Sequence, residues 1–306
     1  MNNFAFFGSD DLSFESLKNL VLSKSVALKL VVVKNKQKNL LKDPIFLFCQ
    51  KNKIFFLNFE KNKTFWNDIL KIFKEKSITS IFCCSFGAIF PLKVINFVKD
   101  TFNLHPSFLP RWKGPSPIVY SIRHDPISAV CIIKIAKEVD SGDIIKMEPF
   151  LIDIKDNYLS VLSKIKEIVH KNLSKWINEY YQNNFSLIKQ DKSKETISKM
   201  ITFSKRKINF EKNVLDVYNF IRSFPKSDLP YFCFKNNLFF IDECNFFETK
   251  ETILPKTIIL SKNQLKIYCL NGFINILKIQ KEGKKILNIK SFLNGKLIFK
   301  NYDQTQ

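Results

Sequence analysis

The chain contains an amide, an imidazole and a carboxylate in an arrangement that could polarise a carbonyl group. Asn103 and His105 lie two positions apart at the end of a predicted strand, so their side chains point the same way. An amide donor beside an imidazole can bind a carbonyl oxygen and stabilise its oxyanion. Asp140 follows in an acidic turn, from which its carboxylate could orient His105 and set its protonation. No Ser or Cys is paired with an evident base, so direct transfer is favoured over a covalent intermediate.

The same residues also have a structural interpretation. A lone His beside a Pro, such as His105, is more often structural than catalytic, and Asp140 or Asp143 could simply form a turn. Residue types alone therefore indicate a polar centre without naming its reaction.

The elements that would position this centre alternate in type along the first half of the chain. Strands are predicted at Asn3–Phe7, Val26–Val33, Lys53–Leu57, Ile78–Phe82, Thr101–His105 and Val130–Ile135, and helices at Leu12–Ser23, Pro44–Gln50, Asn67–Lys76 and Leu92–Val98. This alternation predicts an α/β domain with a doubly wound, mainly parallel sheet of Rossmann-like type. Ligands of such sheets bind at the carboxyl ends of the strands, so we expect the chemistry in the turns after Phe7, Phe82 and Leu104.

The second half has a different pattern of predicted secondary structure. A helix is predicted at Asn213–Arg222, and short apolar runs separated by turn residues then follow at near-regular spacing, which is typical of a small, OB-like β-barrel. We predict a catalytic domain over 1–187, a basic linker over 188–204 and a C-terminal β-barrel domain over 205–306.

Basic residues exceed acidic ones by 49 to 28, which gives a net charge of +21. Only four of the basic residues are Arg, a pattern that an A/T-rich genome produces without selection for binding. The segment Lys189–Lys207 is nevertheless enriched, with seven basic and two acidic residues, as a polyanion partner would require. Composition alone leaves both explanations open.

Other classes of protein are disfavoured. The chain has no run of about 18 uncharged apolar residues, so we expect no membrane span. Its seven Cys are an odd number, and we expect them to be reduced and buried in an intracellular compartment. No Cys/His spacing suits zinc, and we expect no metal.

The motif Asn103-x-His105, followed by Pro-Ser-Phe-Leu-Pro-Arg-Trp-Lys-Gly and by Asp140-x-Gly142-Asp143, resembles the formyltransferase family that uses 10-formyltetrahydrofolate. The resemblance implies that Asn103, His105 and Asp140 are catalytic, with the amide and a protonated imidazole stabilising the oxyanion while an amine attacks the formyl carbon. It also implies a set of residues that line the site of the formyl donor. These are Ser85, Phe86, Gly87, Ala88, Ile89, Phe90, Pro91, Ser107, Leu109, Pro110 and Gly142.

The loop Leu-Pro-Arg-Trp-Lys-Gly-Pro-Ser-Pro-Ile is most similar to members of the family whose acceptor is methionyl initiator tRNA. That resemblance implies that the basic connector and the C-terminal barrel contact tRNA. The expected contacts are Lys36, Lys38, Arg111, Lys113, Lys205, Arg206 and Lys207. Two alternatives stay open: a sugar-nucleotide N-formyltransferase with the same centre, and a non-catalytic RNA-binding relative.

The loop after the second strand departs from many bacterial members of the family. Residues 33–42 are short and lack the Gly, Pro and Arg of the loop that inserts into the acceptor arm, which puts that contact in doubt. A short loop is more similar to the mitochondrial branch, whereas the lack of an Arg-rich presequence fits the cytoplasm of an A/T-rich bacterium. We expect a monomer in the mitochondrial matrix, with that cytoplasm as the alternative.

Overall fold

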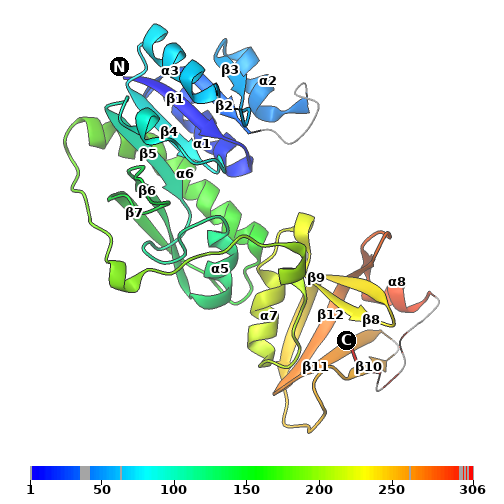
Figure 1. Cartoon of the computed structure of the whole chain (residues 1–306). Coiled ribbons are helices and arrows are strands. Elements are labelled where there is room, and N and C mark those ends of the chain that lie inside the picture. Colours follow the sequence, from blue (N-terminus) through cyan, green and yellow to red (C-terminus); the bar gives the residue numbers. More distant parts are fainter. Residues whose placement is uncertain are drawn as a thin grey trace. The chain divides into compact units, whose positions relative to one another are not determined.

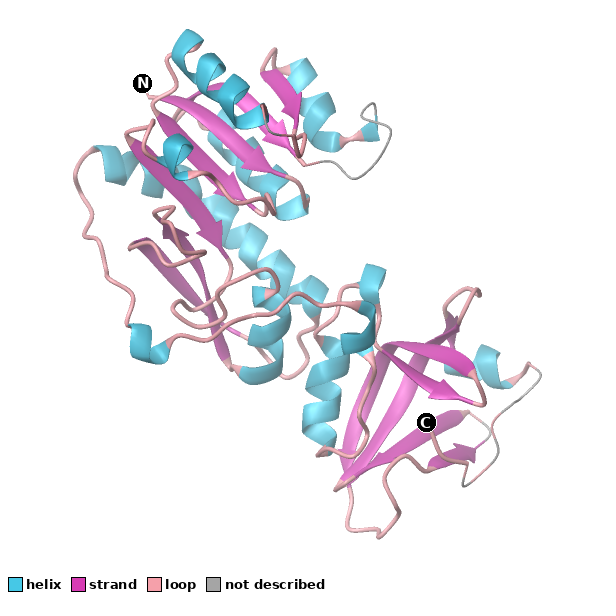
Figure 2. Cartoon of the chain, in the orientation of Figure 1, coloured by secondary structure: helices cyan, strands magenta, loops and turns pink. Residues whose placement is uncertain are grey.

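The computed structural model describes residues 2–34, 42–62, 64–261, 263–295, 299, 301 and 303–305. The chain forms two compact units (Figures 1 and 2). The first comprises Met1–Pro117, Ile127–Leu151 and Leu162–Lys199, and the second comprises Ile118–Pro126, Ile152–Val161 and Met200–Gln306. Among the described residues, no helix combines the length and the apolar character that crossing a bilayer requires.

The first unit is built on a seven-stranded sheet in the order β3-β2-β1-β4-β5-β6-β7. Its strands are β1 Asn3–Gly8, β2 Ala27–Val33, β3 Phe55–Asn58, β4 Ser80–Cys84, β5 Asp100–His105, β6 Ile127–Ile133 and β7 Ile144–Leu151. The first five are parallel; at one edge β6 pairs antiparallel with β5, and β7 pairs antiparallel with β6. The prediction of a mainly parallel α/β sheet is therefore confirmed.

Helices follow the strands, and the first four lie close to the predicted positions. They are α1 Asp11–Leu22, α2 Pro44–Lys51, α3 Phe65–Glu75, α4 Leu92–Ile95, α5 Pro117–His124 and α6 Tyr158–Tyr181. The Asp10 carboxylate accepts from the backbone N–H of Ser13, and the Ser13 hydroxyl accepts from the Asp10 N–H, so a capping box begins α1 directly after β1. Asp43 caps α2, whose first residue is Pro44. At this first helical position the missing N–H of proline removes no hydrogen bond of the helix.

Aromatic side chains fill both faces of the sheet, as the alternation along β1 requires. Phe4 and Phe6 stack on Phe102 and Phe82, at centroid distances of 5.8 and 5.7 Å. Phe7 points to the opposite face, where it joins a core that includes helix α3. Because all these rings are buried, the sheet is rigid where β4 and β5 end side by side.

The sequence prediction missed α5 and β7. A Pro-rich loop precedes α5 and obscures its start, and Pro149 interrupts the apolar run of β7. Proline is tolerated in β7 because this strand lies at the edge of the sheet.

The second unit contains an antiparallel sheet that forms a half-barrel. Its strand order is β10-β11-β12-β9-β8, and β13 pairs with β12. Its strands are β8 Tyr231–Phe234, β9 Asn237–Glu248, β10 Ile258–Ser261, β11 Gln264–Cys269, β12 Gly272–Lys281 and β13 Leu287–Asn288, and its helices include α7 Val214–Arg222 and α8 Ile289–Leu293. Buried residues of α7, α8 and the sheet form one core. This agrees with the predicted small β domain.

The predicted linker is divided between the units. Residues up to Lys199 belong to the first unit, and those from Met200 belong to the second. Ile188 forms an antiparallel bridge with Ile144 at the start of β7, and Ile197 forms a parallel bridge with Lys113. We call residues 188–199 the connector segment; it is bonded at both ends to the first unit.

Candidate active site

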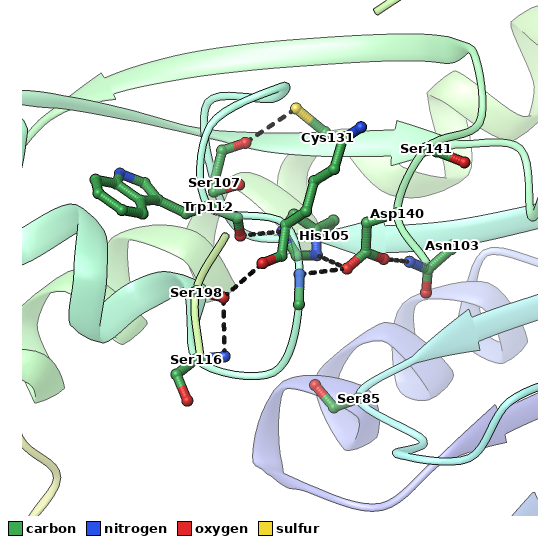
Figure 3. Close-up of polar contacts among 12 residues, drawn as sticks. Ser85, Asn103, His105, Ser107, Trp112, Ser116, Cys131, Asp140, Ser141 and Ser198 are labelled. Carbon is green, nitrogen blue, oxygen red and sulfur yellow. Dashed lines mark hydrogen bonds and ion pairs between the residues drawn. The ribbon is translucent and has the colours of Figure 1, made fainter. Parts of the chain in front are cut away.

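Asp140 is the point at which the predicted polar residues converge (Figure 3). It lies in the loop between β6 and β7, and its carboxylate accepts from Asn103 Nδ2 at 3.0 Å and from the Gly114 N–H at 2.9 Å. His105 Nδ1 lies 3.4 Å from the same carboxylate. Asn103 and His105 come from the end of β5 and point the same way, as their spacing predicted. Two hydrogen-bond donors and an imidazole, from two separate segments, thus surround one carboxylate.

His105 is fixed at both ring nitrogens. Its Nδ1 faces Asp140, and its Nε2 lies 3.0 Å from the backbone carbonyl oxygen of Trp112. Both neighbours are hydrogen-bond acceptors, so only the imidazolium form can donate to both at once. The ring is only 4% exposed, and the carboxylate of Asp140 faces it. The site therefore places a buried imidazole between a carboxylate and a backbone carbonyl oxygen.

Asn103 is half-buried, unlike the buried His105. One of its amide hydrogens is donated to Asp140, and the part of the chain that the structure describes provides no partner for the second. The second N–H can therefore donate to a bound carbonyl group. Since β5 pairs with β4 through Asn103 and Cys83, the loop that begins at Ser85 follows on the neighbouring strand.

The loop Ser85–Pro91, predicted to line the site of the formyl donor, has two kinds of side chain. Phe86 and Phe90 are buried and pack edge-on against Phe7, with centroid distances of 5.1 and 4.9 Å. Ile89 is 74% exposed, so it presents an apolar surface to a ligand. Gly87 has a φ of +67°, which suits glycine, and its carbonyl accepts from Lys34 Nζ. The aromatic pair thus supports the loop, while its exposed residues are available for contact.

Other residues predicted to line the site of the formyl donor shape the neighbouring loops. Ser107 is fully buried and donates to the Arg111 carbonyl at 2.7 Å, and Leu109 is buried against β6. Pro110 is half-buried. Gly142 has no room for a side chain, because a Cβ there would lie 1.9 Å from the carbonyl oxygen of Lys134.

The predicted tRNA contacts lie in different surroundings. Lys36 and Lys38 fall outside the described residues. Arg111 stacks on Trp112 at 4.9 Å, and in the second unit Arg206 pairs with Asp228 at 3.3 Å while Lys205 and Lys207 are exposed.

Lys113 differs from what a phosphate contact requires. It is only 3% exposed, and its ammonium donates to Glu195 of the connector segment at 2.7 Å. This lysine therefore joins two segments of the chain in the structure.

The connector segment supplies residues that the sequence prediction missed. Gln190 Nε2 donates to the carbonyls of Asp140 and Gly142, and the Ser198 hydroxyl donates to the Lys113 carbonyl. No spacing rule relates these residues to Asn103 or His105, since they lie far along the chain in a segment that was interpreted only by its charge.

The cysteines are all free thiols, and all but Cys233 are buried, in line with the sequence prediction for those six. Among the residues that the structure describes, no group of three or more His, Cys, Asp or Glu side chains is placed to hold a metal ion.

Comparisons with known proteins extend this geometry. Residues 5–177 match the family model described as formyl transferase, and residues 200–297 match the model of its C-terminal domain. The chain is 27% identical to the methionyl-tRNA formyltransferase of Mycoplasma mycoides subsp. mycoides SC, over 95% of this chain and 94% of that protein. It is also 27% identical to the methionyl-tRNA formyltransferase of Rickettsia prowazekii, over 97% of each protein.

Solved structures share the fold. One is the N-formyltransferase from Helicobacter canadensis in complex with folinic acid and dTDP-3-aminofucose, which has a TM-score of 0.70 and 21% identity and covers 92% of this chain and 100% of that chain. Another is a sugar 3N-formyl transferase solved with dTDP and 5-N-formyl-THF, which has a TM-score of 0.63 and 23% identity and covers 93% of this chain and 99% of that chain.

Proposed function

The chain belongs to the formyl transferase family, and from that premise we propose that it transfers a formyl group from 10-formyltetrahydrofolate to the α-amino group of methionyl initiator tRNA. The observation that carries the proposal is the convergence of Asn103, His105 and the Gly114 N–H on the carboxylate of Asp140. A site with a fixed amide donor and a fixed imidazole suits direct transfer between two bound substrates.

Each residue has a distinct task in this reaction. Asn103 directs its second amide N–H at the formyl oxygen, where negative charge develops as the amine attacks the carbon. The carboxylate of Asp140 keeps the amide of Asn103 in that direction. It also balances the charge of a protonated His105, and that positive charge in turn helps to stabilise the developing oxyanion. When bound, 10-formyltetrahydrofolate would supply the formyl group. The formyl carbon gains its bond to the α-amino nitrogen and loses its bond to N10, and the proton lost by the amine balances the one gained by N10.

The residues near Asn103 fit a folate donor. The loop Ser85–Pro91 follows the strand next to Asn103 and combines the exposed apolar side chain of Ile89 with backbone polar groups. Binding sites for flat ligands typically have this mixture of apolar surface and a few polar groups. We assign this loop to the donor and the connector side of the site to the acceptor.

Two observations favour tRNA as the acceptor over a sugar nucleotide. The relatives named methionyl-tRNA formyltransferases align with nearly the whole chain, whereas the sugar-modifying enzymes, at 21 and 23% identity, share its fold alone. The net charge of +21 and the exposed lysines of the connector segment also match a polyanionic acceptor.

A transfer assay tests the choice of acceptor. Purified protein is incubated with 10-formyltetrahydrofolate and either methionyl initiator tRNA or a panel of dTDP-amino-sugars, and the formylated product is identified by mass spectrometry. We expect formylation of the methionyl-tRNA alone. Formylation of only the amino-sugars would refute the proposed acceptor while keeping the reaction, and an inactive protein that still binds tRNA would support the non-catalytic alternative.

A further inference from the structure

Gln190 holds the turn that carries Asp140. Its side-chain nitrogen donates to the Asp140 carbonyl at 2.8 Å and to the Gly142 carbonyl at 2.7 Å. Two acceptors face this end of the amide, which identifies it as the nitrogen. A single side chain from the connector segment therefore ties together both ends of the Asp140–Gly142 turn.

The turn requires such support because its backbone is unusual. Asp140 has a φ of +53°, in the left-handed region that residues other than glycine rarely adopt. Conformations of this kind persist where the surroundings over-determine them. Because the direction of the Asp140 carboxylate depends on this backbone, the contacts of Gln190 set where that carboxylate lies.

Ser198 supports Asp140 from the other side. It is fully buried, its hydroxyl donates to the Lys113 carbonyl at 2.9 Å, and the same oxygen accepts from the Ser116 N–H at 3.2 Å (Figure 3). Gly114 lies between these two anchor points and donates its N–H to Asp140. A Cβ on Gly114 would lie 2.7 Å from the Ser198 carbonyl oxygen, so the two backbones are in close contact.

We propose that Gln190 and Ser198 are positioning residues of the reaction, which hold Asp140 through its backbone and through its Gly114 donor respectively. The inference rests on the proposed function. It gives the connector segment a task that its charge does not reveal, because uncharged side chains of this segment set the geometry of the catalytic carboxylate. Two of the exposed lysines of the same segment, Lys192 and Lys199, are assigned to the acceptor, so mutations can separate the two tasks.

The first test replaces Gln190 in the full-length protein with residues that differ in donor capacity. Gln190→Met keeps a similar volume but removes both donated hydrogen bonds, whereas Gln190→Lys restores N–H donors. We expect Gln190→Met to lower kcat on the order of 10- to 100-fold with little change in either KM, as displaced catalytic groups do. Gln190→Lys should be at least several-fold faster than Gln190→Met. The control Gln182→Met, at an exposed glutamine, should leave kcat unchanged.

Ser198→Ala provides an independent test, with Ser193→Ala as its matched control on the exposed part of the segment. We expect a lower kcat for Ser198→Ala and wild-type values for Ser193→Ala. Wild-type kcat in both Gln190→Met and Ser198→Ala, or equal rates for Gln190→Met and Gln190→Lys, would overturn the inference. If Gln190→Met fails to fold, Ser198→Ala decides the result.

A crystal structure of Gln190→Met, or of Ser198→Ala if that variant is the one that folds, separates this inference from the proposed function. Loss of the contact between Asp140 and Asn103 in the variant supports positioning even if the wild-type protein formylates another acceptor. An unchanged Asp140 overturns it. Formylation of only another acceptor by the wild-type protein refutes the acceptor assignment alone.

Discussion

Asn103 Nδ2 donates to Asp140 Oδ1 at 3.0 Å, although Asn103 is at the end of β5 and Asp140 lies in the loop between β6 and β7. The bond fixes the amide so that one N–H is occupied and the other points away from the carboxylate. A donor that is oriented before the substrate arrives needs no reorganisation during the reaction, which is the condition under which it stabilises developing charge most.

Removing the amide of Asn103 should reduce turnover. We expect Asn103→Ala to lower kcat on the order of 10²- to 10³-fold, since one oxyanion donor is lost. Asn103→Asp should be slower still, because it places a second negative charge beside Asp140. Steady-state formylation kinetics measure both, with circular dichroism as a check of folding. Near wild-type turnover in a folded Asn103→Ala protein would contradict the assignment.

Asp140→Asn isolates the charge of this residue from its backbone. Asparagine tolerates the left-handed φ of +53°, so the turn should keep its shape. In the proposed reaction a protonated His105 then lacks its balancing carboxylate, and we expect kcat to fall on the order of 10²- to 10⁴-fold. Asp143→Asn, in the same turn, is the matched control and should retain activity. Equal losses in the two variants would argue that the turn has only a structural role.

Gly142→Ala should destabilise the first unit. The new Cβ would lie 1.9 Å from the Lys134 carbonyl oxygen, so the backbone must move, at a cost of about 3 kcal/mol or more in the free energy of unfolding. Gly87→Ala is the comparison, because its φ of +67° is also unfavourable but a Cβ there meets no atom closer than 3.8 Å. Its cost should stay at about 1–2 kcal/mol. Urea denaturation of both variants checks the difference, and equal stabilities would contradict it.

Exposed lysines of the connector segment should govern the salt dependence of tRNA binding. We expect Lys192→Gln with Lys199→Gln to reduce the slope of log K against log salt by about 0.7–0.9 for each lysine that contacts a phosphate. Lys71→Gln with Lys74→Gln removes two exposed charges from α3 and should leave the slope unchanged. Filter binding over a range of salt concentrations measures both. If tRNA binding by the wild-type protein did not change with salt concentration, we would attribute the excess of lysine to codon bias.

The buried thiols should resist alkylation in the native protein. Burial raises the pKa of Cys49, Cys83, Cys131 and Cys269 to about 12 in each case, so the reactive thiolate is scarce below that pH. At pH 8 iodoacetamide should label Cys233, the partly exposed thiol, well before these four, and should label them only after denaturation. Mass spectrometry of digests identifies the sites. Rapid labelling of Cys83 in the native protein would contradict its burial.

Local pattern was sufficient to predict most of the fold. Alternating apolar residues, capping residues such as Asp10 and the spacing of strands and helices act over short distances, so they can be read along the chain. The features that escaped prediction are those in which a local rule is broken. Pro149 in β7 is an example, because only its place at the sheet edge makes it acceptable.

The sequence by itself determined that Asn103 and His105 share one side of a strand end and that an acidic turn follows. The sequence also predicted Asp140 as their carboxylate partner. Only the tertiary structure showed that the Asp140 carboxylate accepts from Asn103 Nδ2, and that Lys113 is buried against Glu195, 82 positions away. It also brought Gln190 to the Asp140 turn. Such contacts join segments that are distant in sequence, and whether they form depends on the packing of the whole unit, which no local periodicity records.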